Sequence, residues 1–600
     1  MTNTAIPGKR IVVDDGYTIE LDLAGQVLKI DAVPYEIGSR SGAFAEEVPV
    51  RARIGDLDKC EFVSASVLAQ KAKVFDDGLY AAVDIAAQNG AGCFRGKADL
   101  LRSVGRYLAE ADPIVAGKAQ AILLAAAQLG GVSIANVPEN VINDVQATIE
   151  DFLADELRSK PMGFYAWSEE LSRIFRQDRM LQTELKTHEA IKILVEFLRA
   201  NEATHTVYES YLRLVSRLTN PLAGDDLRKF IHKMDQEVPI PSGCKAKFFP
   251  PSAAHETNIA KKLYGDRPIP PGFVLVDEMI RQIRSGELDL MPQPESGWYD
   301  HQTWALEPLI LPEQMPEAAH LVLSSDYRKL LVDLFKGILA LTRETHIKQL
   351  ELPTVALAGG ELREKTINIP PDLSAEPLPS FYLRRALSYR FVRNVIEECF
   401  GSGELTRMHR LTPDGQVKVS LSEELSAIES LFIGAHATVA YQLGMAPDGA
   451  CGNGSVLQSA CERFAAWAAN PHKDADVGQD LRMMVPIFYD IRRRRTKIWA
   501  FLGWSQRPIS IEFANPPKSR FLDSGGTPVL GPPRIRWAGL YAPLAYPVTA
   551  ELYVDRILDR KEFRKLCNAC KTQKEILRRL GGFPEVNPLK RKEKDLSSNL

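Results

Sequence analysis

One short stretch, residues 296–304, gathers the side chains in this sequence that are most suited to proton transfer. It reads Ser-Gly-Trp-Tyr-Asp-His-Gln-Thr-Trp, so a phenol, a carboxylate and an imidazole stand side by side between two indoles. Flanking indoles exclude water and shift the pKa values of neighbouring acids and bases. We therefore predict that Tyr299, Asp300 and His301 are catalytic. The alternative is an ordinary helix start whose aromatic side chains are buried in the core.

A second pair of candidates lies in the last turns of a long helix predicted over residues 324–349. Glu344 and His346 are two positions apart, so an ideal helix points them to different sides and they cannot bind one metal ion together. The dipole at the C-terminal end of the helix favours a protonated His346. We predict both as catalytic residues, and a structural histidine is the alternative.

Two Glu-x-x-His motifs place a carboxylate and an imidazole on one helix face, which is the ligand pattern of di-iron helical bundles. They pair Glu202 with His205 and Glu317 with His320. A chain of this composition yields about one such pair by chance, so two are weak evidence for a metal site. Pro316 also puts the second pair at a helix start rather than deep in a bundle.

A basic group in the C-terminal half could bind an anion, a phosphate or a nucleic acid. Arg407, His409 and Arg410 precede a predicted hairpin and form our substrate-binding candidates. Further arginines and two tryptophans extend the set, and the tryptophans could stack on bases. These further residues are Arg384, Arg385, Arg390, Arg393, the run 492–495, Trp499 and Trp504.

The remaining motifs are weak. Cys567 and Cys570 have the spacing of a zinc or redox pair, but zinc needs two more ligands and the sequence has no second Cys-x-x-Cys motif. The glycine-rich turn at residues 449–455 follows a predicted helix rather than a strand, so it is not a nucleotide fingerprint. No P-loop, His-Glu-x-x-His or Gly-x-Ser-x-Gly motif occurs. The sequence therefore specifies no cofactor, although a metal stays possible.

Composition favours a soluble, cytoplasmic protein. The chain has 600 residues, 45% hydrophobic and 25% charged, with a formal net charge of −3. These are ordinary globular values, and they give no overall reason to bind nucleic acid or an anionic membrane. The sequence shows no signal peptide and no apolar run long enough to span a membrane. The eight cysteines are sparse, so we expect reduced thiols.

Hydrophobic periodicity predicts an α+β fold that is predominantly α-helical and contains several domains. A small N-terminal β unit comes first, and a C-terminal β-meander is predicted from strands at 485–491, 496–504 and 508–513. The predicted boundaries are a β unit at 1–60, a helical domain at 61–236, a Pro-rich linker at 237–272, a second helical region at 273–375, a C-terminal α/β region at 376–589 and a disordered tail at 590–600.

Two functions fit these patterns. The first is an enzyme in which Asp300 and His301 transfer protons and Arg407 or His409 clamps an anion. The second is a non-catalytic helical scaffold or a phosphate-binding partner of nucleic acid. An enzyme needs these groups to converge around a closed pocket, whereas a scaffold disperses them and exposes a large apolar patch. The sequence does not decide between them.

Overall fold

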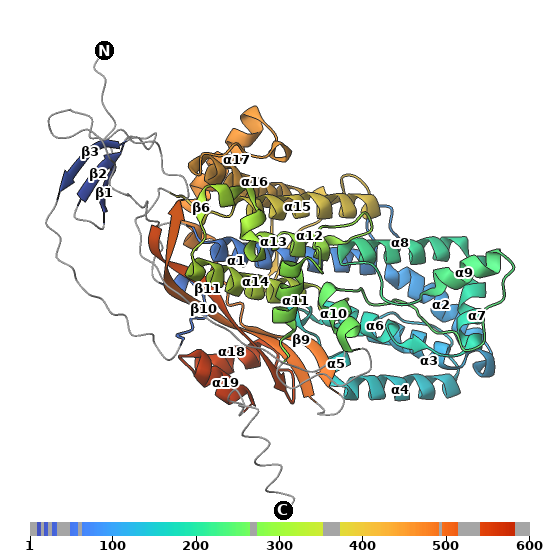
Figure 1. Ribbon diagram of the computed structural model, residues 1–600. Helices are drawn as coiled ribbons and strands as arrows, with labels where there is room; N and C mark the ends of the chain where they lie inside the picture. Colours follow the sequence, from blue (N-terminus) through green and yellow to red (C-terminus); the bar gives the residue numbers. More distant parts are fainter. Residues whose placement is uncertain are drawn as a thin grey trace, which may run out of the picture.

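The structure is a computed structural model, and it describes residues 9–13, 17–21, 27–32, 48–57, 63–264, 273–351, 373–490, 495–513 and 540–581 (Figure 1). The predicted disordered tail, the arginines at 492–494 and part of the Pro-rich linker lie outside these residues. The described chain is mainly helical with small antiparallel sheets, as the sequence predicts.

The predicted N-terminal β unit is present. Strands β1 (Lys9–Val13), β2 (Tyr17–Leu21) and β3 (Val27–Ala32) form a three-stranded antiparallel sheet in chain order. Each of the three strands contains β-branched residues, which favour strand structure.

Helices make up most of the remaining chain. Those of the N-terminal half are α1 (Ala65–Asn89), α2 (Lys97–Glu110), α3 (Pro113–Leu129), α4 (Glu139–Ala154), α5 (Glu156–Ser159), α6 (Glu169–Leu181), α7 (His188–Ala200), α8 (Glu202–Leu218) and α9 (Leu227–Asp235). Next along the chain come α10 (His255–Tyr264), α11 (Leu275–Ser285), α12 (Trp298–Trp304), α13 (Glu307–Ile310) and α14 (Ser325–Thr345). The last group is α15 (Pro379–Phe400), α16 (Leu421–Gln442), α17 (Gly454–Ala468), α18 (Arg560–Asn568) and α19 (Gln573–Gly581).

Helix α1 runs through the middle of the helical body (Figure 1). It is 25 residues long, and nearly all of its residues are buried. A helix buried on all sides is usually apolar throughout, but α1 also carries Lys73, Asp76, Asp77 and Asp84 into the interior. These charges need partners, and α14 and α15 supply many of them.

The predicted C-terminal meander is present, with a different third strand. Strand β9 (Met483–Asp490) pairs with β10 (Arg495–Phe513), which pairs on its other side with β11 (Leu540–Val554). The predicted break before Pro508 does not occur, and β10 continues through this residue. Pro508 lies directly opposite Pro543 in the sheet, so the two residues that lack an N–H donor face each other. Five short strands complete the described set. Among them, β4 (Glu184–Leu185) pairs with β5 (Ala246–Lys247), and β7 (Leu411–Thr412) pairs with β8 (Gly415–Gln416). A further short strand, β6 (Leu321–Val322), adds to the end of β10.

The two faces of this sheet face different apolar clusters. Trp499 and Phe501 belong to the main core, whereas Ile498, Ala500 and Leu502 pack in a smaller cluster with side chains of α18 and α19. Successive side chains of a strand alternate between faces, so β10 joins the helical body to α18 and α19 (Figure 1).

The main hydrophobic core extends across the predicted domain boundaries. A single cluster of buried side chains includes residues from Ile54 to Ala545 and draws on each of the predicted helical regions. The boundaries themselves stay predictions. Among the described helices, none is both long enough and apolar enough to cross a lipid bilayer.

Candidate functional site

Asp300, in α12, is buried, and its carboxylate is bonded to neighbouring polar side chains. Its carboxylate accepts hydrogen bonds from Asn220 Nδ2 at 2.6 Å and Ser296 Oγ at 2.9 Å, and it lies 3.3 Å from His255 Nε2. Burial alone would raise the pKa of Asp300, but His255 and the two hydrogen bonds outweigh it and hold that pKa below its usual value. Asp300 is therefore an anchored anion that joins α8, α10 and α12.

The other two residues of the predicted catalytic run point elsewhere. Tyr299 is fully buried and donates from its hydroxyl to Glu256 Oε1 at 2.6 Å. His301 is half-buried and stacks on Phe391, with ring centroids 3.9 Å apart. Burial, aided by the nearby Arg217 charge, lowers the pKa of His301 to about 4. Consecutive residues of a helix differ by about 100° in direction, which separates these three side chains.

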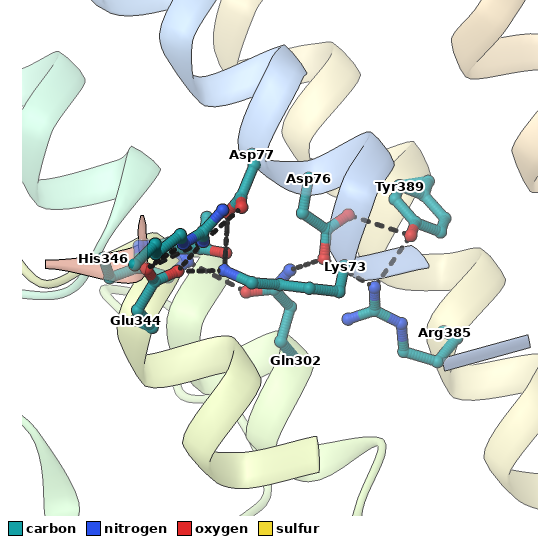
Figure 2. Close-up of polar contacts among 10 residues, drawn as sticks. Lys73, Asp76, Asp77, Gln302, Glu344, His346, Arg385 and Tyr389 are labelled. Carbon is teal, nitrogen blue, oxygen red and sulfur yellow. Dashed lines mark hydrogen bonds and ion pairs between the residues drawn. The ribbon is translucent and has the colours of Figure 1, made fainter. Parts of the chain in front are cut away.

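Glu344 lies in a buried ionic cluster on α1 and α14 (Figure 2). Lys73 Nζ lies 2.5 Å from Glu344 Oε2 and 2.6 Å from Asp77 Oδ1, and Arg560 Nη2 donates to both Glu344 oxygens at 2.7 Å. Burial opposes the charge, yet Arg560 and Lys73 keep the pKa of Glu344 well below its usual range. Glu344 is thus a permanently ionised partner.

His346 follows α14 and is also buried (Figure 2). Its Nε2 lies 2.9 Å from Gln302 Oε1 and its Nδ1 lies 3.2 Å from Thr219 Oγ1. The sequence favoured a protonated ring, but burial holds the pKa of His346 well below its usual value, so the ring is neutral. Gln302 extends this hydrogen-bond network to Asp76, because Gln302 Nε2 donates to the Asp76 carboxylate.

The network continues through Asp76 to α15. Arg385 Nη2 lies 2.8 Å from Asp76 Oδ2, and the Tyr389 hydroxyl donates to Asp76 Oδ1 at 2.9 Å (Figure 2). A similar cluster of two lysines and two aspartates lies further along α1, formed by Asp84, Lys97, Asp178 and Lys348. Buried charges are tolerated when each is paired and hydrogen-bonded, and these clusters meet that condition.

The predicted anion clamp is not assembled from free cations. Arg407 is exposed and pairs with Glu404 at 2.5 Å, while the ring of His409 hydrogen-bonds the Val419 carbonyl at 3.0 Å. Arg410 is buried. Its guanidinium contacts Glu424 at 3.0 Å and Asp476 at 3.1 Å.

The described arginines of the wider basic set are likewise paired within the chain. Its ion pairs are Arg384 with Glu307, Arg385 with Asp76, Arg390 and Arg393 with Glu429, and Arg495 with Asp555. The base-stacking role suggested for the tryptophans is wrong, because the exposed fractions of Trp499 and Trp504 are only 3% and 0%.

The structure does not gather the weak metal candidates into a metal-binding group. Within the described ranges, no group of three or more His, Cys, Asp or Glu side chains could hold a metal ion. Glu317 instead accepts a hydrogen bond from Ser380 Oγ at 2.6 Å, and His205 lies 3.5 Å from Glu209. Glu202 lies in the first turn of α8, and His320 follows a short 3-10 helix.

The two cysteines of the Cys-x-x-Cys motif are free thiols in the structure. Cys567 is buried among α18 and α19 side chains, and burial raises its pKa to about 12. A thiol with a raised pKa is a poor nucleophile and a poor metal ligand.

A pocket of about 660 Å³ lies elsewhere, where five separate segments meet. Its apolar wall is formed by Ile54, Leu57, Val63, Val67, Leu373, Phe464, Ala465, Ala468, Ala469, Pro471 and Ala545. Its polar groups come from Ser64, Ser374, Thr438, Asn470 and His472. None of the described lining residues is Lys, Arg, Asp or Glu.

Backbone pairing and close helix packing build this pocket. The Val63 N–H donates to the Ser374 carbonyl, and the Glu376 N–H donates to the Val63 carbonyl, which fixes the start of α1 beside residues 373–376. On the other side, Gly434 lets α16 approach α17, because a Cβ at this position would clash with the Ala460 carbonyl. The sequence offered no signal for the pocket, since its lining residues are ordinary and come from distant segments.

Glu376 is bonded to residues next to the pocket-lining Ser64, although it is not itself a lining residue. It is fully buried, and its Oε2 accepts a hydrogen bond from the Ala65 backbone N–H at 2.8 Å. Burial raises the pKa of Glu376 to about 7. A pocket with apolar walls, a few convergent polar groups and an adjacent perturbed carboxyl has the usual features of a small-molecule site.

Compared with protein-family models, curated proteins and solved structures, the chain shows no significant match to any of them.

Proposed function

We propose that this protein binds a small, largely apolar organic molecule in the pocket between the start of α1 and helices α16 and α17. The observation that carries the proposal is the pocket itself, whose volume of about 660 Å³ falls within the range of known ligand sites, about 300 to 1,000 Å³. The apolar part of its lining favours an occupant with hydrophobic surface, because burying apolar surface is the main driving force for such binding.

The ionic clusters on α1 support this proposal in a structural role. They link α1 to α14, α15 and α18 by paired charges, which fixes the helix that supplies one side of the pocket. Rigid walls reduce the entropy lost when a ligand binds. We further propose that binding takes place in the cytoplasm, an expectation supported by the unpaired state of the cysteines within the described chain.

A plug in the pocket tests the proposal. Ala465 and Ala466 are both exposed on α17, but only Ala465 is a lining residue of the pocket. We expect neutral aromatic fragments, screened by saturation-transfer NMR, to bind the wild type and the Ala466→Trp control. Ala465→Trp should weaken these same fragments at least tenfold. Identical binding by all three proteins, or no binding to the wild type, would contradict the proposal.

Proton transfer at His301 is a second candidate function, and we propose it on one observation. His301 is half-buried, and no described residue forms a hydrogen bond with its ring. A pKa lowered to about 4 leaves this ring neutral at physiological pH, so it presents a free nitrogen to a bound molecule, although it is a weaker base than an ordinary imidazole. Asp300, Tyr299, Glu344 and His346 would then act as buried supports rather than reactants.

The reactivity of His301 with diethyl pyrocarbonate, which modifies only neutral imidazole, tests its availability. We expect the modification rate of His301, followed by peptide mass spectrometry, to stay nearly constant between pH 7 and pH 5. N-acetylhistidine added to the same reaction is the reference: a free imidazole has a pKa near 6.5 and should lose most of its reactivity over this interval. An unreactive His301 in the native protein would remove it as a candidate.

A further inference from the structure

Ser64 occupies the N-cap position of α1, but its side chain does not cap the helix. A serine at this position normally accepts a hydrogen bond from a backbone N–H in the first turn. In this protein the Val67 N–H donates to the Ser64 carbonyl oxygen rather than to its hydroxyl, and the Ala65 N–H donates to Glu376. The Ser64 hydroxyl, in a residue only 1% exposed, has no hydrogen-bond partner among the described residues. Ser64 is also one of the residues that line the pocket.

An unpaired buried hydroxyl is unfavourable, so such groups nearly always have a partner. The Ser64 O–H can donate to an acceptor atom of a bound molecule. The N-terminal end of α1 carries a partial positive charge, which also favours an acceptor at this place. The polar end of the pocket is therefore set up to receive a hydrogen-bond acceptor.

Among the described lining residues, no permanently charged cation is available to pair with an anionic acceptor. No described lining residue carries a Lys or Arg side chain that could pair with a carboxylate. Lys71, on the same helix, already pairs with Asp474 at 2.7 Å and Asp476 at 3.2 Å. The Glu376 carboxyl, which accepts the Ala65 N–H beside Ser64, adds no positive charge to this side of the pocket. Burying an unpaired charge is costly.

We infer that the ligand is an uncharged, mainly hydrocarbon molecule with one hydrogen-bond-accepting oxygen, of the ketone or ester type, and that the Ser64 hydroxyl donates to this oxygen at the start of α1. This inference rests on the proposed function of the pocket. It assigns Ser64 as the residue that determines ligand specificity, and it assigns the apolar wall as the source of most of the binding free energy.

Three probes of the same shape test the inference: 2-acetylnaphthalene, which has a neutral acceptor, 2-ethylnaphthalene, which has none, and 2-naphthoate, which is an anion. We expect the wild type to bind the ketone about fivefold more tightly than the ethyl compound, the effect of one hydrogen bond. The anion should bind at least tenfold more weakly than the ketone. Isothermal titration calorimetry gives the three dissociation constants.

The variant Ser64→Ala should reduce the preference for the ketone over the ethyl compound to less than twofold. It should fold, because the hydroxyl makes no capping bond. Ser66→Ala is the matched control on the same helix, since that hydroxyl already donates to the Ala545 carbonyl at 2.8 Å. This control should keep the fivefold preference.

Several results would overturn the inference: tighter binding of 2-naphthoate, equal binding of the ketone and the ethyl compound by the wild type, or a ketone preference that survives Ser64→Ala. A further case is that none of the three probes binds while Ala465→Trp still abolishes fragment binding. That result would overturn the inference about the ligand but leave the proposed function of the pocket intact. Failure of the proposed pocket function has a different signature: no fragment loses affinity when Ala465→Trp fills the pocket.

Discussion

At the scale of one residue, the burial of Glu376 beside the start of α1 makes the stability of the protein depend on pH. Its carboxyl accepts the first N–H of that helix, and it lies in the interior with an exposed fraction of 0%. Desolvation disfavours the charged form, which raises the pKa of Glu376 from 4.5 to about 7. The folded protein therefore holds this proton at pH values where the unfolded chain has released it.

The sign of the resulting pH dependence follows directly. Below pH 4.5 both states are protonated, so Glu376 makes its full contribution to stability. Between pH 4.5 and pH 7 only the unfolded state releases the proton, so the free energy of unfolding falls by about 1.4 kcal/mol per pH unit, or about 3 kcal/mol in all. Above pH 7 the loss is complete.

We predict that Glu376→Gln removes this dependence. Urea unfolding measured from pH 4.5 to pH 8 should show the wild type losing about 3 kcal/mol more than the variant. The amide can still accept from Ala65, which keeps the helix start intact. Parallel pH profiles of the two proteins would contradict the assignment of a raised pKa to Glu376.

At the scale of elements, buried ion pairs attach the C-terminal helices to the body. Arg560 opens α18, and its guanidinium reaches Glu344 on α14 and Asp77 on α1. Arg560 and Glu344 are 216 positions apart in the chain. The contact therefore fixes α18 and the sheet beneath it against the helical core.

We predict that Arg560→Met destabilises the protein by about 3 kcal/mol, because it leaves two buried carboxylates with Lys73 as their remaining cation. Hydrogen exchange should increase in α18 before it increases in α1. Lys561→Met is the control, since Lys561 is exposed and forms no ion pair in the described chain; it should change stability by less than about 0.5 kcal/mol. Equal effects of the two substitutions would contradict the docking role of Arg560.

Local signals predicted some elements well and others poorly. Ser420 and Glu423 have the spacing of a capping box, and both capping bonds are present at the start of α16. The turn around Asp414 correctly indicated the hairpin of β7 and β8. The extent of β10 was not predictable, because Pro508 is tolerated only through its pairing with Pro543, a contact between distant segments.

At the scale of the whole molecule, one apolar cluster crosses the predicted domain boundaries at residues 236, 273 and 376. A shared core makes separate unfolding of its parts unfavourable, since each part would expose its face of the cluster. We predict a single main transition in differential scanning calorimetry, with a van't Hoff enthalpy close to the calorimetric one. Two or more resolved transitions would mean that the predicted domains fold independently.

The partners of the buried polar residues and the pocket could not be predicted from the sequence. Residue types and spacing singled out Asp300, Glu344 and His346 as catalytic candidates, and in the structure each is buried and bonded to other side chains of the protein. The sequence could not show that those partners are other side chains of the protein rather than a substrate. The pocket was not predictable either, because alanines, leucines and serines carry no signal until the fold brings five segments together.

The most direct test of the central claim is X-ray diffraction from crystals of the full chain soaked with bromobenzene, a small neutral aromatic of the kind that enters apolar cavities. The account predicts an anomalous bromine peak inside the pocket, within van der Waals distance of Val67, Phe464 or Ala465. Bromine peaks confined to other parts of the protein, or no peak at all, would contradict it.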